Sequence, residues 1–159
     1  MHKIIVYIEL HWGLRRPNLE FYLNGQQLIP VDCNIVETIK FQENVEFHLT
    51  TESLAAKDNV FQIIMRDKTD NDTITVDGES IDHWVKIREL EIDDIKFQMS
   101  LYNASKFEHS MPEDWVSNMA QQGYQIEPCY MRAADIRLNG TWTITFDTPI
   151  WQWWCENYE

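Results

Sequence analysis

Five aspartates gather in one polar stretch of the chain, within residues 65–94. They are Asp67, Asp70, Asp72, Asp77 and Asp82, and Asn71 lies among them. Carboxylate and amide oxygens are the ligands that Ca²⁺ prefers, and a calcium site takes about six to eight of them. The composition of this stretch therefore predicts a calcium site.

The spacing does not match the linear calcium loop of EF-hands. Counted from Asp70 as the first position, the fifth and sixth are Ile74 and Thr75, where that loop needs Asp or Asn and then Gly. We therefore expect any site to be assembled by the fold, with Asp67, Asp70 or Asp72 on one side and Asp77 or Asp82 on the other. The alternative is an ordinary polar connection, in which Asp and Asn side chains cap turns.

A second candidate site is the cluster of aromatic residues at the end of the chain. Trp151, Trp153 and Trp154 lie within four residues, and Tyr158 follows. In an extended segment Trp151 and Trp153 would project to one side and could stack on sugar rings. Trp84 is added as a further ligand-binding candidate. The alternative is that these rings seal the core or a subunit interface, because Trp carries a large buried area.

Catalytic spacings are missing from the sequence. No HExxH, GxSxG, P-loop or GxGxxG motif occurs, and the five histidines are scattered. We therefore expect a protein that is not an enzyme. A glycosidase remains the alternative, since its two carboxylates would meet only in the folded chain.

Charge and length exclude further classes of protein. The net charge of −13 disfavours general binding to a phosphate backbone. No apolar run approaches the ~18 residues of a membrane span, and the apolar N-terminal run is too short for a signal peptide. We expect a soluble protein. Cys33, Cys129 and Cys155 are odd in number and lack the spacing of a zinc site.

Alternating apolar residues predict many short strands. The pattern is clear at Ile4–Leu10, Leu19–Leu23, Val45–Leu49 and Phe61–Met65, whereas residues 32–38 break it. Two Asn-Gly pairs, Asn24-Gly25 and Asn139-Gly140, predict hairpins. The sequence therefore predicts one all-β domain over residues 1–159, an antiparallel β-sandwich that resembles a jelly roll.

Two irregularities are also predicted. Val85 and Ile87 share one parity, while Leu90 and Ile92 share the other, so a β-bulge is expected at Arg88-Glu89. A turn or second bulge at Asp93-Asp94 then leads into a strand over residues 95–101.

One short helix is predicted over residues 111–122. Ser110 and Glu113 have capping-box spacing, and Gly123 is placed to end the helix. Trp115 and Met119 lie four apart, so that face can dock on the sheet.

Part of the chain resembles a known family. Arg66-Asp67-Lys68-Thr69-Asp70-Asn71-Asp72-Thr73, followed by a strand that ends Leu90-Glu91-Ile92-Asp93-Asp94-Ile95, is similar to calcium-dependent xylan-binding modules. The resemblance covers the middle third and implies a jelly-roll sandwich that binds sugar without catalysis. The sequence lacks that family's Asp-Arg-Asn-Leu run and carries a helix and a C-terminal hairpin in addition.

A second resemblance points to a structural role. The Lys-Thr-Asp-Asn-Asp-Thr loop at 68–73, with Leu-Asn-Gly-Thr-Trp at 138–142 and Pro-Ile-Trp at 149–151, looks like uncharacterised proteins of large marine tailed phages. It implies a virion or tail component. We thus expect either a carbohydrate-binding sandwich, assisted by Ca²⁺, or a virion-associated protein that forms homo-oligomers through its Trp-rich tail or a sheet edge.

Overall fold

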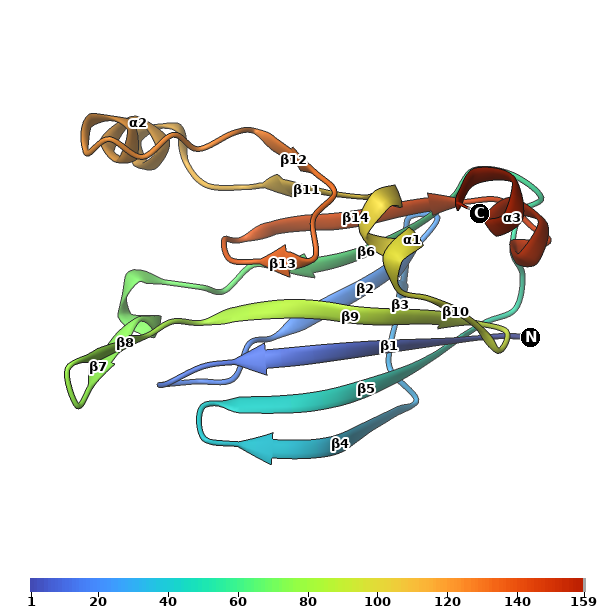
Figure 1. Ribbon diagram of the computed structural model, residues 1–159, viewed down its shortest axis with the longest axis horizontal. Coiled ribbons are helices and arrows are strands. Elements are labelled where there is room, and N and C mark those ends of the chain that lie inside the picture. The colour runs from blue at the N-terminus through green and yellow to red at the C-terminus, as the bar shows by residue number, and fades with distance from the viewer. Residues whose placement is uncertain (159) are drawn as a thin grey trace.

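Two antiparallel sheets pack face to face around one hydrophobic core, so the predicted all-β sandwich is confirmed (Figure 1). The computed structural model describes the backbone of residues 1–158, and the side chains of all of these except 99–101 and 158. The core forms because alternate residues of each long strand face inward. Ile4, Val6 and Ile8 of one sheet meet Phe61 and Ile63 of the other in a single cluster.

The first sheet, sheet A, has the strand order β10-β9-β1-β5-β4, and β13 also pairs with β9. Its strands are β1 (His2–His11), β4 (Asp32–Ile39), β5 (Gln42–Thr51), β9 (Trp84–Ile92), β10 (Ile95–Phe97) and β13 (Asp135–Ile136).

The second sheet, sheet B, has the order β12-β11-β14-β6-β2-β3. Its strands are β2 (Leu19–Leu23), β3 (Gln26–Leu28), β6 (Asn59–Met65), β11 (Ser105–His109), β12 (Cys129–Met131) and β14 (Gly140–Phe146).

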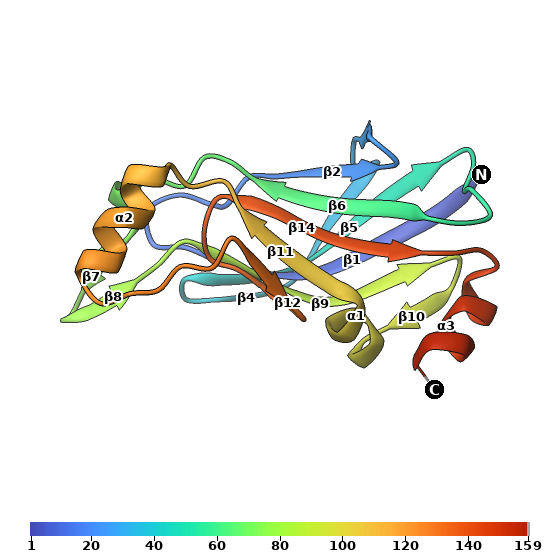
Figure 2. The same ribbon diagram turned by 90° about the horizontal axis from the view of Figure 1, so that it is seen from above.

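Most of the remaining elements lie at the two ends of the sandwich (Figure 2). The hairpin β7 (Ile74–Val76) and β8 (Glu79–Ile81) lies at the same end as helix α2 (Glu113–Gln121), and helix α3 (Ile150–Tyr158) lies at the other end (Figure 2). A 3-10 turn η1 (Asp70–Asp72) precedes the hairpin, and a short helix α1 (Met99–Ala104) follows β10.

The predicted bulge is confirmed. Tyr7 of β1 pairs with Glu89 of β9, and Ile8 pairs with Ile87, so Arg88 is the extra residue. The turn that follows is also as expected, because Asp93 and Asp94 both adopt positive φ and Ile92 pairs with Ile95. The Asn24-Gly25 hairpin between β2 and β3 is confirmed as well.

The prediction of a hairpin at the second Asn-Gly pair, Asn139-Gly140, is wrong. β13 pairs with β9 in sheet A, whereas β14 begins at Gly140 in sheet B, so the chain crosses between sheets here. Gly140 serves a close approach instead, since a Cβ on it would lie 2.4 Å from the carbonyl oxygen of Glu108. The Asn139 side chain bonds both backbone groups of Lys68, at 2.9 Å each.

The helix near residues 111–122 exists, but its details differ. It begins at Glu113 after Pro112, and no side chain caps it, so the predicted capping box is wrong. Gly123 ends it as expected, with φ of +91°. None of its residues is buried, and Trp115 lies beside the acidic stretch rather than on a sheet, in a small hollow lined by Lys68 and Thr69.

Three further stretches differ from the sequence prediction. Residues 99–101 belong to α1 and not to the strand that ends at Phe97. Residues 32–38 form most of β4, although they lack alternation, because β4 is an edge strand whose residues are all exposed. The tail predicted as extended is helix α3, in which Ile150, Trp153 and Trp154 lie on one face.

Candidate functional site

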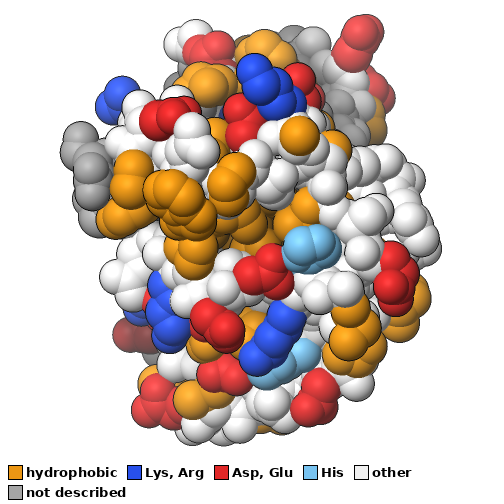
Figure 3. Space-filling model, turned by 90° about the vertical axis from the view of Figure 1, so that its right-hand side faces the viewer, with side chains coloured by type: hydrophobic (Ala, Val, Ile, Leu, Met, Phe, Trp, Pro, Cys, Tyr) orange, Lys and Arg blue, Asp and Glu red, His pale blue; other side chains and the backbone are white. Residues whose placement is uncertain are grey.

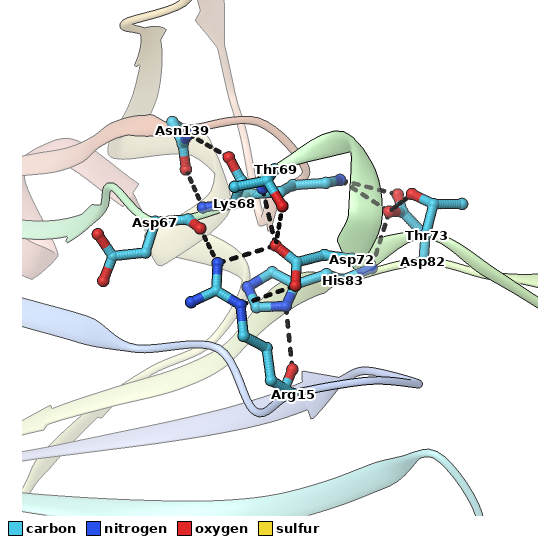
Figure 4. A network of polar contacts seen from close by, with 9 residues as sticks. All are labelled: Arg15, Asp67, Lys68, Thr69, Asp72, Thr73, Asp82, His83 and Asn139. Carbon is cyan, nitrogen blue, oxygen red and sulfur yellow. Dashed lines mark hydrogen bonds and ion pairs between the residues drawn. The ribbon is translucent and has the colours of Figure 1, made fainter.

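Asp72 is the best-buried carboxylate of the acidic stretch, at 1% exposed. Arg15, which follows β1, donates from Nε and Nη2 to its two oxygens at 2.7 and 2.9 Å (Figure 4). The Thr69 N–H donates to it as well, at 2.7 Å. The hydrogen bonds from Arg15 lower the pKa of Asp72 to about 2. Its charge is therefore balanced by Arg15.

Asp82 is held by a second internal cation. Lys68 Nζ lies 2.8 Å from Oδ1 of Asp82, and the Thr73 hydroxyl donates to the same oxygen at 2.8 Å. Burial alone would raise the pKa of Asp82, but the hydrogen bonds from Lys68 and Thr73 outweigh it, and the net pKa is lowered. Lys68 also donates to the carbonyl oxygen of Arg137 at 2.6 Å.

The carboxylates of the other three aspartates are exposed and take no part in this network. Asp67 contributes its backbone carbonyl to Arg15, and Asp70 lies on η1. Asp77 and Gly78 form the β7–β8 turn, with φ of +50° and +81°. An Asp-Gly pair is typical of such a hairpin turn, but the sequence prediction assigned Asp77 to a calcium site instead. In the described part of the chain, no three His, Cys, Asp or Glu side chains are close enough to hold a metal ion. The calcium site stays a prediction.

His83 joins this network from the protein interior. It is 2% exposed, and its Nδ1 lies 3.1 Å from the carbonyl oxygen of Arg15. Because a carbonyl only accepts, Nδ1 is assigned the proton. Nε2 is buried without a hydrogen-bond partner among the described residues. Burial lowers the pKa of His83. No motif or spacing in the sequence marks this residue as part of a site.

The Trp84 indole is closed on both faces. His11 of β1 stacks on it with centroids 4.0 Å apart and an 8° interplanar angle. The Arg137 guanidinium, beside β13, lies 3.9 Å from the ring centroid. Since β1 and β13 flank β9 on opposite sides, the two neighbours cover opposite ring faces. A sugar ring therefore finds no free face on Trp84 in this arrangement.

The aromatic residues of α3 divide between the core and the surface. Trp153 is 9% exposed and meets the rings of Phe97 and Phe146 edge-on, at 5.9 and 6.3 Å. Trp154 packs partly against the core, whereas Trp151 is 59% exposed. Hydrophobic side chains gather on the end of the molecule where α3 lies (Figure 3). The Tyr158 side chain lies outside the described residues.

A groove of about 780 Å³ lies on the outer face of sheet A. Its floor is made by the outward residues of the three central strands, which alternate with the core residues. They are Tyr7 and Glu9 of β1, Asn44 and Glu46 of β5, and Lys86, Arg88 and Glu89 of β9. Lys96, Gln98 and Tyr102 close one side, and Val36 closes the other.

Several charged groups in this groove form ion pairs. Glu9 bonds Arg88, and Lys96 Nζ lies 3.2 Å from Glu89 and 3.7 Å from Glu91. Lys96 also lies over the Tyr7 ring, 5.2 Å from its centroid. Sequence reasoning missed this groove, because its residues are joined only by the pairing of β9, β1 and β5.

Comparison of the chain with protein-family models, with curated proteins and with solved structures finds no significant match. Among the described residues, no helix is both long and apolar enough to cross a membrane.

Proposed function

We propose that this chain is a carbohydrate-binding β-sandwich without catalytic activity, and that the groove on the outer face of sheet A holds the sugar. The proposal is supported by the mixture of groups along that groove. Hydroxyl groups of sugars both donate and accept hydrogen bonds, and the groove is lined by amides, carboxylates and cations. Tyr7 and Tyr102 add two aromatic rings to its lining.

Electrostatics favours a neutral or hydroxyl-rich ligand. The chain carries a net charge of −13, and the groove contains Glu9, Glu46 and Glu89. Since Glu9 and Glu89 are already bonded to Arg88 and Lys96, their positions are fixed before a ligand arrives. Preorganised polar groups lose less conformational entropy on binding than mobile ones.

A glycan array that includes xylan fragments tests the proposal, with calorimetry on any hit. Tyr7→Ala should weaken binding about tenfold, which corresponds to ~1.4 kcal/mol. Tyr124→Ala is the matched control, because Tyr124 is 59% exposed and lies beyond α2, outside the groove. Binding to no glycan contradicts the proposal.

Two further arms separate the alternatives from the main proposal. Trp151→Ala should leave binding unchanged, and a loss would move the sugar site to α3. Ca²⁺ removal by EDTA should abolish binding if the ion orients the sugar, whereas retained binding contradicts the calcium part alone. Cleavage of a glycan by the wild type that is lost in Glu9→Gln or Glu89→Gln would favour an enzyme over a binding module.

One observation favours an assembly role as the second candidate. β4 is an edge strand with eight exposed residues, and Ile35, Val36 and Ile39 are 49–63% exposed. An exposed apolar edge pairs readily with another strand. This supports a virion-type or homo-oligomeric protein that assembles through β4. Sizing across a wide concentration range, with Ile35→Lys as the variant, tests it, and a monomer at all concentrations contradicts it.

A further inference from the structure

A second hollow, of about 790 Å³, adjoins the groove and shares Lys86, Tyr102 and Ala133–Ala134 with it. Its walls are mainly apolar and come from sheet B and the segments around β12. They are Phe107, Ile126, Tyr130, Met131 and Leu138. Tyr130 and Met131 are 37% and 68% exposed. Apolar walls around an open hollow favour a ligand that removes them from water.

The floor of this hollow is fixed to both sheets. The Trp142 indole N–H of sheet B donates to the Ala133 carbonyl oxygen at 2.8 Å. The Ile87 N–H of sheet A donates to the Ala134 carbonyl oxygen at 2.8 Å. Because segment 132–134 is tied down on both sides and carries two alanines, the space above it is preformed.

Two of the three cations that line this hollow make no ion pair among the described residues. Eight of the 13 Lys and Arg side chains are in ion pairs. Lys86, Arg132 and Arg137 line the hollow with one carboxylate, Asp135, which pairs with Arg137 at 3.4 Å. Neither Lys86 nor Arg132 has an ion pair or a side-chain hydrogen bond among the described residues. In a chain with a net charge of −13, two free cations beside one apolar hollow are complementary to a negative group.

The backbone at Arg132 adds an independent observation. Arg132 has φ of +59°, a conformation that favours glycine, and its N–H donates to the Ser105 carbonyl oxygen at 2.8 Å. Glycine would fit this position with less strain. A strained residue that also supplies a free cation at a hollow points to a function for its side chain.

We propose that this hollow is a binding site for an amphiphilic anion, a molecule with an apolar body and one carboxylate or sulfonate group. The apolar body lies between Tyr102, Tyr130 and Met131. The anionic group lies against Arg132 and Lys86, and Arg132 is placed to form a bidentate contact with it. This site is distinct in chemistry from the polar groove and goes beyond sugar binding.

Two fluorescent ligands with the same type of apolar body test the proposal. One is 8-anilinonaphthalene-1-sulfonate, which is anionic, and the other is N-phenyl-1-naphthylamine, which is neutral. Arg132→Gly combined with Lys86→Gln should raise the Kd for the anion about tenfold and change the Kd for the neutral ligand less than about twofold. Decanoate should displace the anionic ligand, whereas decanol at equal concentration should displace it less.

The variants are chosen so that unfolding cannot imitate lost binding. Arg132→Gly removes the cation and relieves the left-handed backbone, so the fold should persist, and circular dichroism checks this. Lys57→Gln is the matched control, because it removes an exposed cation that does not line the hollow. The proposal is overturned if the double variant loses affinity equally for both ligands, or if its affinity for the anion is unchanged. It is also overturned if Trp151→Ala, rather than the double variant, weakens binding of the anion.

Discussion

Arg15 and Asp72 form a two-point ion pair that joins the segment after β1 to the acidic stretch after β6. The two residues are 57 positions apart in sequence, and their N–O distances are 2.7 and 2.9 Å. Asp72 is nearly fully buried, whereas the Arg15 side chain is 45% exposed. The aspartate-rich stretch is therefore organised by the chain's own cations.

Asp72→Asn should destabilise the fold by about 1–3 kcal/mol, because buried donors lose their charged acceptor. The pKa of Asp72 lies near 2 in the folded chain against an ordinary 3.8, so its stabilisation is present above pH 4 and is lost as pH falls toward 2. Urea unfolding at several pH values should show that the variant lacks this acid-sensitive part. Asp70→Asn, at an exposed position of η1, is the control. A parallel loss of stability at low pH in wild type and Asp72→Asn would contradict this.

His83→Asn tests the buried imidazole. Burial lowers the pKa of His83 below 6.5, so the folded chain holds it neutral while the unfolded chain binds a proton below that pH. Its contribution to stability is therefore full above pH 6.5 and declines as pH falls below it. Burial also lowers the pKa of His11. The His83→Asn variant should therefore keep part of the pH dependence of stability that the wild type shows. The free energy of unfolding, measured at pH 8, 7 and 5.5, should fall less in His83→Asn, and equal slopes would contradict the prediction.

Substitutions of the α3 tryptophans should differ sharply in their cost to stability, because Trp153 is buried and Trp151 is exposed. Trp153→Ala removes a ring that packs against Phe97 and Phe146, and it should cost about 3–5 kcal/mol. Trp151→Ala changes an exposed side chain and should stay within about 0.5 kcal/mol of wild type. Chemical denaturation of both variants checks this, and similar losses would mean that Trp151 is also covered in solution.

The sheets could be predicted from sequence where one strand face is buried. The parity slip between Ile87 and Leu90 located the bulge at Arg88, because the core accepts only one face of β9. The same rule failed for β4, since an edge strand exposed on both faces needs no alternation. It failed again at α3, where Ile150, Trp153 and Trp154 follow helical spacing within a run too short and too aromatic to separate from a strand.

The candidate sites were less predictable, because they depend on which strands become neighbours. The acidic stretch was visible as composition, but the pairing of its carboxylates with Arg15 and Lys68 was not, since Arg15 arrives from another connection. The groove over Tyr7 needs β9 and β5 on either side of β1. The hollow beside Arg132 needs a crossover where a second hairpin was expected.

The backbone strain at Arg132, one support for the proposed site, can be tested through stability alone. Both Arg132→Gly and Arg132→Ala remove the cation, but only glycine relieves the left-handed backbone at φ of +59°. That relief is worth roughly 1–2 kcal/mol, and the greater freedom of glycine in the unfolded chain offsets about 0.4–1 of it. Arg132→Gly should therefore be about 0.5–1 kcal/mol more stable than Arg132→Ala, as measured by urea unfolding. Equal stabilities would show that the position carries no strain and would remove one support for a functional Arg132.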